Sequence, residues 1–152
     1  MKRHPASTYP QQLCKIELYD TLQSTSGQKG NVQKPNETPE YQDLIRQLRG
    51  FVDERDWSQF HSPKNLAMAL TGEIGELVEH FQWLSSEASD ALDATTRHDV
   101  RRELADVQIY LMLLADRLDV DLMQAVADKI EENALKYPAH RARGRSDKYD
   151  KL

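Results

Sequence analysis

Hydrophobic residues recur at spacings of three and four along most of the chain, which is the period of amphipathic helices. Four such segments cover about residues 39–55, 62–84, 95–118 and 119–137. Pro138 ends the last segment, because proline cannot continue a helix. No segment alternates between polar and hydrophobic residues as a strand does. The pattern therefore predicts an all-α fold with four helices.

Residues 1–38 do not share this pattern. Residues 21–38 are rich in Ser, Thr, Gln, Asn and Gly and contain two aliphatic side chains. Such a segment buries too little surface to offset the entropy lost on ordering. We expect residues 1–38 to form a disordered N-terminal tail, residues 39–138 an all-α domain and residues 139–152 a basic C-terminal tail.

Length and charge exclude several classes of function. The 152 residues carry a net charge of −5, and a length of this order predicts one domain. An acidic chain is not expected to bind a nucleic acid polymer, whose phosphates attract Lys and Arg. No apolar run has the length of a membrane span, and none resembles a signal peptide. The lone Cys14 cannot form an internal disulfide. We therefore expect a cytoplasmic protein without a membrane partner.

Several acidic residues occur close to the hydrophobic sides of two expected helices. At about 100° per residue, Glu73 falls about 20° outside the apolar arc of the second helix and Glu76 about 80° outside it. On the third helix, Glu103 lies beside the hydrophobic residues and Asp106 lies on their flank. A carboxylate at a seam between helices is unfavourable unless it is paired or binds a cation, and no Lys or Arg is expected on these faces. The sequence predicts four carboxylates converging on a hard ion such as Mg²⁺ or Mn²⁺.

Two alternatives to this metal site remain open. Acidic pairs at i and i+3 are common on solvated helix faces, although two pairs on successive helices make this explanation weaker. A di-iron bundle uses Glu-x-x-His pairs, whereas His80 follows Glu76 by four residues. The spacing therefore disfavours the di-iron alternative.

A set of motifs occurs along residues 40–152 in a fixed order. They are Phe51-x-x-Glu54-Arg55-Asp56-Trp57, Gly72-Glu73-Ile74-Gly75-Glu76-Leu77, Phe81-Gln82-Trp83, Glu103-Leu104-Ala105-Asp106 and Asn133-x-x-Lys136-Tyr137-Pro138. In this order the motifs resemble those of the MazG-like all-α nucleoside triphosphate pyrophosphohydrolases. The likeness is greatest to the dCTP pyrophosphatase branch of that family.

This resemblance implies an enzyme of nucleotide pool sanitation. The implied reaction is Mg²⁺-dependent hydrolysis of a (deoxy)nucleoside triphosphate, dCTP or a modified dCTP being favoured, to a monophosphate and pyrophosphate. By similarity, Glu73, Glu76, Glu103 and Asp106 hold Mg²⁺, with Mn²⁺ as a possible substitute. Glu73 and Glu76 are the candidate catalytic residues. The resemblance also implies a four-helix MazG-like bundle that is completed by oligomerisation, as a homotetramer formed from two dimers.

The resemblance also implies a set of substrate-binding residues. These are Trp57, His61, Trp83 and Tyr110 for the base, and Asn133 and Lys136 for the phosphates. From the residues alone, the tryptophans could equally be core residues and His61 a surface residue. Asn133 and Lys136 could equally be solvated residues at the end of a helix. These alternatives stay open at the level of sequence.

One position departs from the pattern of the branch. A histidine is expected nine residues before Trp57, and this chain has Leu48 there. The departure leaves the nucleobase preference open, so dUTP, nucleoside triphosphates in general or phosphoribosyl-ATP are alternative substrates. A helical interaction module that has lost catalysis is the alternative from another class of protein.

Overall fold

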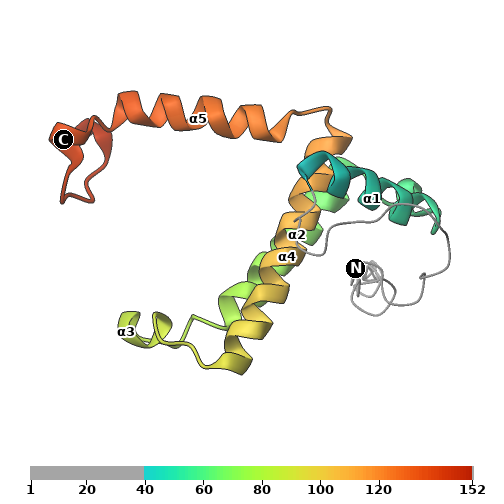
Figure 1. The fold of residues 1–152 in the computed structure, drawn as a ribbon, viewed down its shortest axis with the longest axis horizontal. Coiled ribbons are helices and arrows are strands. Elements are labelled where there is room, and N and C mark those ends of the chain that lie inside the picture. The colour runs from blue at the N-terminus through green and yellow to red at the C-terminus, as the bar shows by residue number, and fades with distance from the viewer. Residues whose placement is uncertain (1–39, 152) are drawn as a thin grey trace, which may run out of the picture. The chain divides into compact units, whose positions relative to one another are not determined.

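The computed structural model describes residues 40–151, and every regular element in this part of the chain is helical (Figure 1). The four long helices are α1 (Tyr41–Asp53), α2 (Pro63–Glu79), α4 (Ala94–Arg117) and α5 (Leu122–Lys136). The short elements are η1 (Trp57–Gln59), α3 (Ser86–Ser89), α6 (Ala139–Ala142) and η2 (Tyr149–Lys151). The prediction of an all-α fold is confirmed. The expected N-terminal tail lies outside the described residues.

Polar side chains begin the helices at or near the expected positions. The hydroxyl of Ser62 accepts a hydrogen bond from the backbone N–H of Asn65 at 3.2 Å and so starts α2. The carboxylate of Asp121 does the same for Gln124 at 3.0 Å and starts α5. None of the helices in residues 40–151 combines the length and the hydrophobicity of a membrane span.

The N-cap of α4 is an aspartate that precedes the expected segment. Asp93 holds this position, and its Oδ1 accepts hydrogen bonds from the backbone N–H groups of Thr95 and Thr96, both at 2.9 Å. A carboxylate satisfies two of the unpaired amides of the first turn at once, and its charge also favours the helix N-terminus. The helix therefore begins at Ala94, one residue before the expected segment.

The prediction that the second helix continues to Leu84 is wrong. The helix ends at Glu79, and the backbone N–H groups of Phe81 and Gln82 both donate to the carbonyl of Val78. This shared acceptor ends the regular i to i−4 ladder. Ser85 then caps the short helix α3, so the intervening residues form a connection.

Helix α4 ends in a Schellman motif built on an aspartate. Asp119 has a φ of 54°, the left-handed conformation that Gly usually adopts at this position. The backbone N–H of Val120 donates to the carbonyl of Ala115 at 2.9 Å, and that of Asp119 donates to Asp116 at 3.2 Å. These bonds satisfy the last carbonyls of α4 and separate it from α5.

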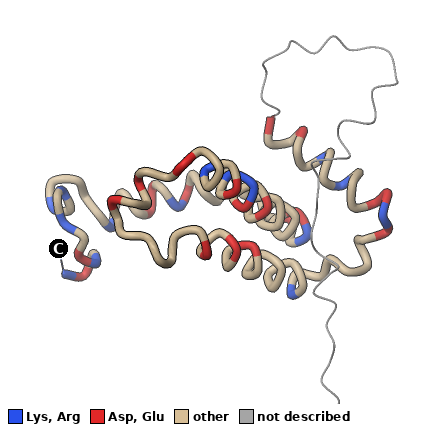
Figure 2. Tube along the Cα trace, turned by 90° about the horizontal axis from the view of Figure 1, so that it is seen from below, with Lys and Arg blue, Asp and Glu red and all other residues tan. Residues whose placement is uncertain are grey.

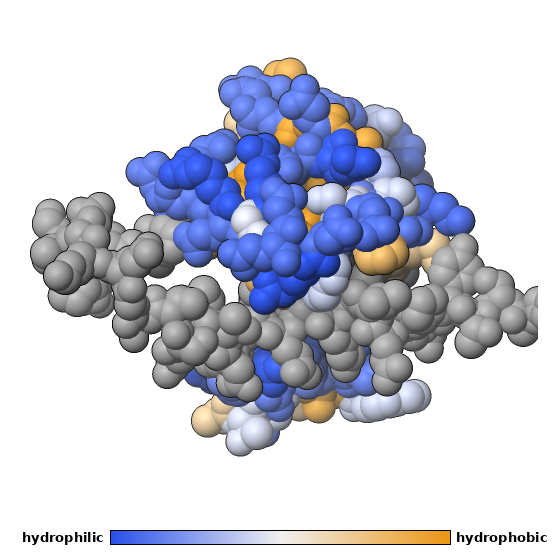
Figure 3. All heavy atoms as spheres, turned by 90° about the vertical axis from the view of Figure 1, so that its right-hand side faces the viewer, coloured by the Kyte–Doolittle hydropathy of each residue, from blue (hydrophilic) through white to orange (hydrophobic). Residues whose placement is uncertain are grey.

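Helices α2 and α4 lie side by side and form the most extensive contact among the described elements (Figures 1 and 2). The buried hydrophobic residues come from α1, α2 and α4: Ile45, Leu48, Val52, Leu66, Val100, Tyr110, Met112, Leu113 and Ala115. Other apolar residues of α2 and α4, including Ile74 and Leu104, are exposed. Helix α5 has no buried residue. Hydrophilic side chains dominate the face seen in Figure 3, with hydrophobic ones scattered among them.

Candidate functional site

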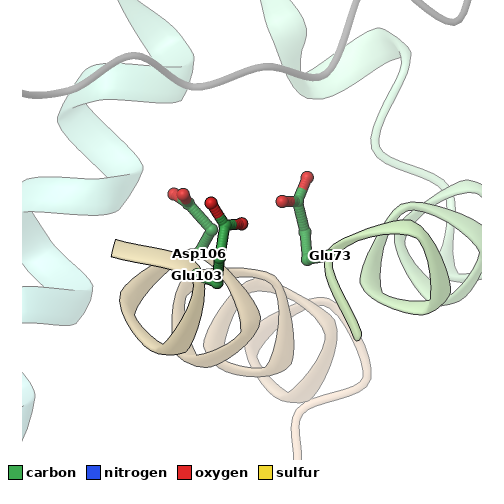
Figure 4. Close-up of side chains that lie close together, drawn as sticks. All are labelled: Glu73, Glu103 and Asp106. Carbon is green, nitrogen blue, oxygen red and sulfur yellow. The ribbon is translucent and has the colours of Figure 1, made fainter. Parts of the chain in front are cut away.

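Three carboxylates from two helices meet between α2 and α4 (Figure 4). Glu103 and Asp106 lie one turn apart on α4, and Glu73 approaches them from α2. One oxygen of each carboxylate lies within 4.8 Å of the corresponding oxygens of the other two, and all three residues are half-buried. The seam between the helices therefore brings together acids that are 30 or more residues apart in sequence.

This group has the chemistry of a site for a hard divalent cation. Mg²⁺ binds oxygen ligands at about 2.0–2.1 Å, so two ligands on one ion lie at most about 4.2 Å apart. The three oxygens lie within 4.8 Å of one another, and a small rotation of the side chains would bring them to that spacing. The three residues fit a magnesium or manganese ion, because the donor set contains oxygen alone.

Glu76, the fourth predicted ligand, is not part of this three-residue group. It lies one turn after Glu73 on α2 and is half-buried. Its place on the same side of the helix follows from the i, i+3 spacing. Its role as a ligand or catalytic residue stays a prediction.

Trp57 lies in a segment that side-chain contacts hold in place. Its ring meets Phe51 edge to face, with 5.8 Å between centroids, and it meets His61 at 6.4 Å. The guanidinium of Arg55 stacks over the ring of Phe51, at 3.6 Å from the ring centroid. Gln59 donates to the backbone carbonyl and the carboxylate of Asp56, which has a φ of 52°. The segment therefore holds Trp57 and His61 together.

The other two aromatic residues of the predicted base site have opposite environments. Tyr110 is 1% exposed and lies one turn after Asp106 on α4. Trp83 is 87% exposed and lies beyond the C-terminal end of α2. Helix α2, whose 17 residues span about 25 Å at 1.5 Å per residue, lies between Trp57 and Trp83 in the chain. Trp57 precedes one end of this helix and Trp83 follows the other, so a base site shared by both tryptophans stays a prediction.

The predicted phosphate-binding residues lie on the exposed helix α5. Lys136 forms an ion pair with Glu132, which raises the pKa of Lys136. Lys129 and Lys136 together lower the pKa of Glu132 to about 2. Asn133 lies on the exposed surface of the same helix. Within one chain, Lys136 is thus engaged on its own helix, and phosphate binding by these residues stays a prediction.

A small pocket between α1, η1, α2 and α4 was not predicted from the sequence. Its volume is about 100 Å³, and its floor is formed by Val52, Leu66 and Leu113. The polar residues around the floor are Arg49, Asp53, Ser58, His61, Asp116 and Arg117. His61 is the one member that the sequence had assigned to a site. Arg49 and Asp116 are 67 positions apart, and their charges alone gave no sign of a shared pocket.

The pocket contains an ion pair and a buried imidazole. Arg49 Nε lies 3.1 Å from Oδ2 and 3.2 Å from Oδ1 of Asp116, and Arg49 Nη2 also donates to Oδ1. His61 is 8% exposed. Burial, and then the positive charge of Arg117, lower the pKa of His61. The imidazole is therefore neutral at pH 7, with one nitrogen as donor and the other as acceptor.

The sequence of this chain matches a known protein family. The model of the MazG-like family matches residues 69–152, which is more than half of the chain. This chain belongs to the MazG-like family. The matched MazG-like region contains Glu73, Glu103 and Asp106, which form the acidic group between the two helices.

The sequence is also similar to individual members of the MazG-like family. The chain is 47% identical to dCTP pyrophosphatase 1 of Mus musculus over 116 residues, which are 75% of this chain and 68% of that protein. It is 46% identical to dCTP pyrophosphatase 1 of Homo sapiens, with the same shares covered. The resemblance found in the sequence motifs is confirmed.

A solved structure extends the similarity to the fold. A pyrophosphatase from Archaeoglobus fulgidus matches with a TM-score of 0.63 and 37% sequence identity. The match covers 70% of this chain and 99% of that structure. The all-α fold of this MazG-like chain is thus shared with a pyrophosphatase of known structure.

Proposed function

We propose that this protein hydrolyses dCTP, or a closely related modified dCTP, to the nucleoside monophosphate and pyrophosphate. Water adds to the α-phosphorus, and the bond from that phosphorus to the bridging oxygen of the β-phosphate breaks. The pair of electrons leaves with pyrophosphate, and the proton of the water is released to a base. Removal of such triphosphates keeps unwanted nucleotides out of the precursor pool.

The acidic group of Glu73, Glu103 and Asp106 is the observation that carries this proposal. Three carboxylate oxygens within 4.8 Å of one another, in a chain related to dCTP pyrophosphatases, support a divalent-cation site. Bound Mg²⁺ would neutralise the polyphosphate and stabilise the negative charge that develops on the leaving pyrophosphate. We propose Mg²⁺ as the natural ion and Mn²⁺ as a substitute.

The remaining residues are proposed to orient the substrate and to accept the proton. Glu73 and Glu76 lie on one side of α2, and either carboxylate can take the proton of the attacking water. Trp57 and His61 offer an aromatic edge and a neutral imidazole to the base. Tyr110 is buried one turn from Asp106, so it can fix the position of a nucleotide held at the acidic group.

We further propose that the active form is a homo-oligomer, a dimer of dimers. Large hydrophobic side chains of α2, α4 and α5 are exposed, among them Met68, Ile74, Leu104, Val126 and Ile130. A second copy that covers these side chains would remove an unfavourable apolar surface from water. It could also supply Trp83, Asn133 and Lys136 to a site on its neighbour. A cytoplasmic location is proposed with this role.

Release of pyrophosphate from a panel of nucleoside triphosphates tests the proposed activity. The wild type is expected to prefer dCTP in the presence of Mg²⁺ and to lose activity with a chelator. Glu73→Gln should lower kcat by roughly a hundredfold or more, because it removes one charge from the acidic group. Glu79→Gln is the matched control, since Glu79 is an exposed residue of the same helix outside the acidic group.

The panel also separates the alternatives. Equal turnover of all bases would remove the preference for cytosine and leave a general nucleoside triphosphate pyrophosphohydrolase. Absence of turnover with every nucleotide and metal would support a non-catalytic helical module. A loss of helical content in Glu73→Gln would mark that carboxylate as a structural residue.

A further inference from the structure

The pocket between α1 and α4 is large enough for one flat ring and too small for a whole nucleotide. Its volume of about 100 Å³ is well below the roughly 300–1,000 Å³ of pockets that hold drug-sized ligands. The apolar floor of Val52, Leu66 and Leu113 suits the face of a heterocycle, while the polar side chains suit its edge. The shape and lining therefore favour a single polar ring as the occupant.

The pocket lies further along the side of α4 that carries the acidic group. Asp106, Tyr110, Leu113 and Arg117 follow one another at spacings of three and four, so they share one face of the helix. Asp116 lies ten residues after Asp106, which is about 15 Å along the axis. An extended nucleoside triphosphate also places its phosphates and its base at opposite ends. A nucleotide whose phosphates are held at the acidic group can thus direct its base toward the pocket.

The polar groups of the pocket include both acceptors and donors. The half-buried carboxylate of Asp116 only accepts hydrogen bonds, and its bidentate contact with Arg49 leaves it further acceptor capacity. His61 is buried and lines the pocket, and its neutral imidazole has one donor and one acceptor nitrogen. Arg117 contributes donors and forms no ion pair within residues 40–151.

This arrangement matches the edge of cytosine better than the edges of uracil or thymine. Cytosine has an amino donor at C4 and acceptors at N3 and O2, which suit a carboxylate beside an imidazole and a guanidinium. Uracil and thymine have a carbonyl oxygen at C4, which a carboxylate would repel. A polar group left without a partner in a binding pocket is a strong means of discrimination.

We propose that this pocket binds the cytosine ring and that Asp116, held in place by Arg49, accepts the hydrogen bond of the 4-amino group and selects cytosine over uracil. The inference rests on the proposed function, since it assigns the base specificity of the same enzyme. Asp116 is the specificity-determining residue, and Arg49 is a positioning residue that acts through it.

The ratio of kcat/KM for dCTP to that for dUTP tests this proposal. In Asp116→Asn the amide can donate to a C4 carbonyl, so the ratio should fall at least about tenfold, as expected when a hydrogen bond to a charged group is lost. Arg49→Gln should raise the KM for dCTP several-fold while kcat stays close to the wild-type value, and Arg49→Lys should restore part of the loss. Asp43→Asn is the matched control. It removes the aspartate of the Asp43–Arg46 ion pair, which lies within α1 and outside the pocket.

A binding experiment on the wild type keeps the proposal testable if a variant does not fold. Titration with dCMP and dUMP, followed by tryptophan fluorescence, should show at least about tenfold tighter binding of dCMP. An unchanged dCTP to dUTP ratio in folded Asp116→Asn, or equal binding of the two monophosphates, would overturn the inference while hydrolysis of dCTP still supports the proposed function. A wild type that releases no pyrophosphate from any nucleotide would instead overturn the proposed function.

Discussion

Leu66 offers a direct test of the packing between α2 and α4. Within α2, which the structure describes in full, Leu66 is the only buried residue, and it is 2% exposed. It belongs to the seam that brings Glu73 to the acids of α4, and it also forms part of the floor of the pocket. Leu66→Ala would leave a cavity in this seam.

The expected loss follows from the burial of the side chain. Replacing a fully buried Leu by Ala removes transfer free energy and leaves a cavity, which together lower the free energy of unfolding by about 2–5 kcal/mol. We expect a value of about 3 kcal/mol, because the pocket beside Leu66 already limits the packing on one side. A loss of this size is a large part of the roughly 5–15 kcal/mol of a typical domain.

Leu104→Ala is the matched comparison, since it makes the same change on α4 at a residue that is 52% exposed. Within one chain, this substitution should lower the free energy of unfolding by about 1 kcal/mol. Complete burial of Leu contributes about 1.5 kcal/mol or more, and Leu104 is only about half buried. Urea unfolding, followed by far-UV circular dichroism over a wide range of protein concentrations, measures both variants. The effect of Leu104→Ala should grow with concentration if the proposed assembly covers this residue.

Two results would refute this reasoning. A loss below about 1 kcal/mol for Leu66→Ala would mean that the residue does not hold the seam together. Equal losses for the two variants at the lowest protein concentration would mean that burial in the single chain does not determine the energetics.

Three further predictions concern the metal, the pH dependence and a helix cap. Mg²⁺ at 100 times its dissociation constant should stabilise the wild type by about 2.7 kcal/mol in thermal unfolding, and Glu103→Gln should reduce this effect whereas Glu79→Gln should keep it. Because the pKa of His61 is lowered in the folded state, the unfolded chain takes up the proton first, so stability should fall as the pH decreases below 6.5. Urea unfolding between pH 5 and 8 should show a weaker dependence in His61→Gln, and an unchanged slope would contradict the assignment. Ser62→Ala should lower the free energy of unfolding by about 1 kcal/mol through loss of the bond to Asn65 N–H, and Ser62→Thr should retain most of it. Equal urea midpoints for Ser62→Ala and wild type would count against this cap.

Much of the fold could be predicted from local sequence because its causes are local. The Ser62-Pro63 start, the Asp121 cap and the stop at Pro138 depend on side chains within one turn of the backbone that they satisfy. Hydrophobic spacing identified four helices for the same reason. The end of α2 was missed, because its apolar spacing continues through Phe81 after the backbone ladder has ended.

The candidate site was predicted from the sequence only in part. The acidic residues were found from sequence, because i, i+3 spacing on an apolar face is a local pattern that resembles a family motif. Whether their oxygens meet depends on the packing of α2 against α4, and that packing brought Glu73, Glu103 and Asp106 together without Glu76.

The sequence by itself determined the helical class, the position of most helix ends and the acidic motif, since each depends on neighbours within a few residues. Tertiary structure alone decided which hydrophobic residues are buried, where Trp83 lies and that Arg49 meets Asp116 across 67 positions. Such contacts depend on how whole helices pack against one another. The spacing of residues within one helix contains no information about that packing.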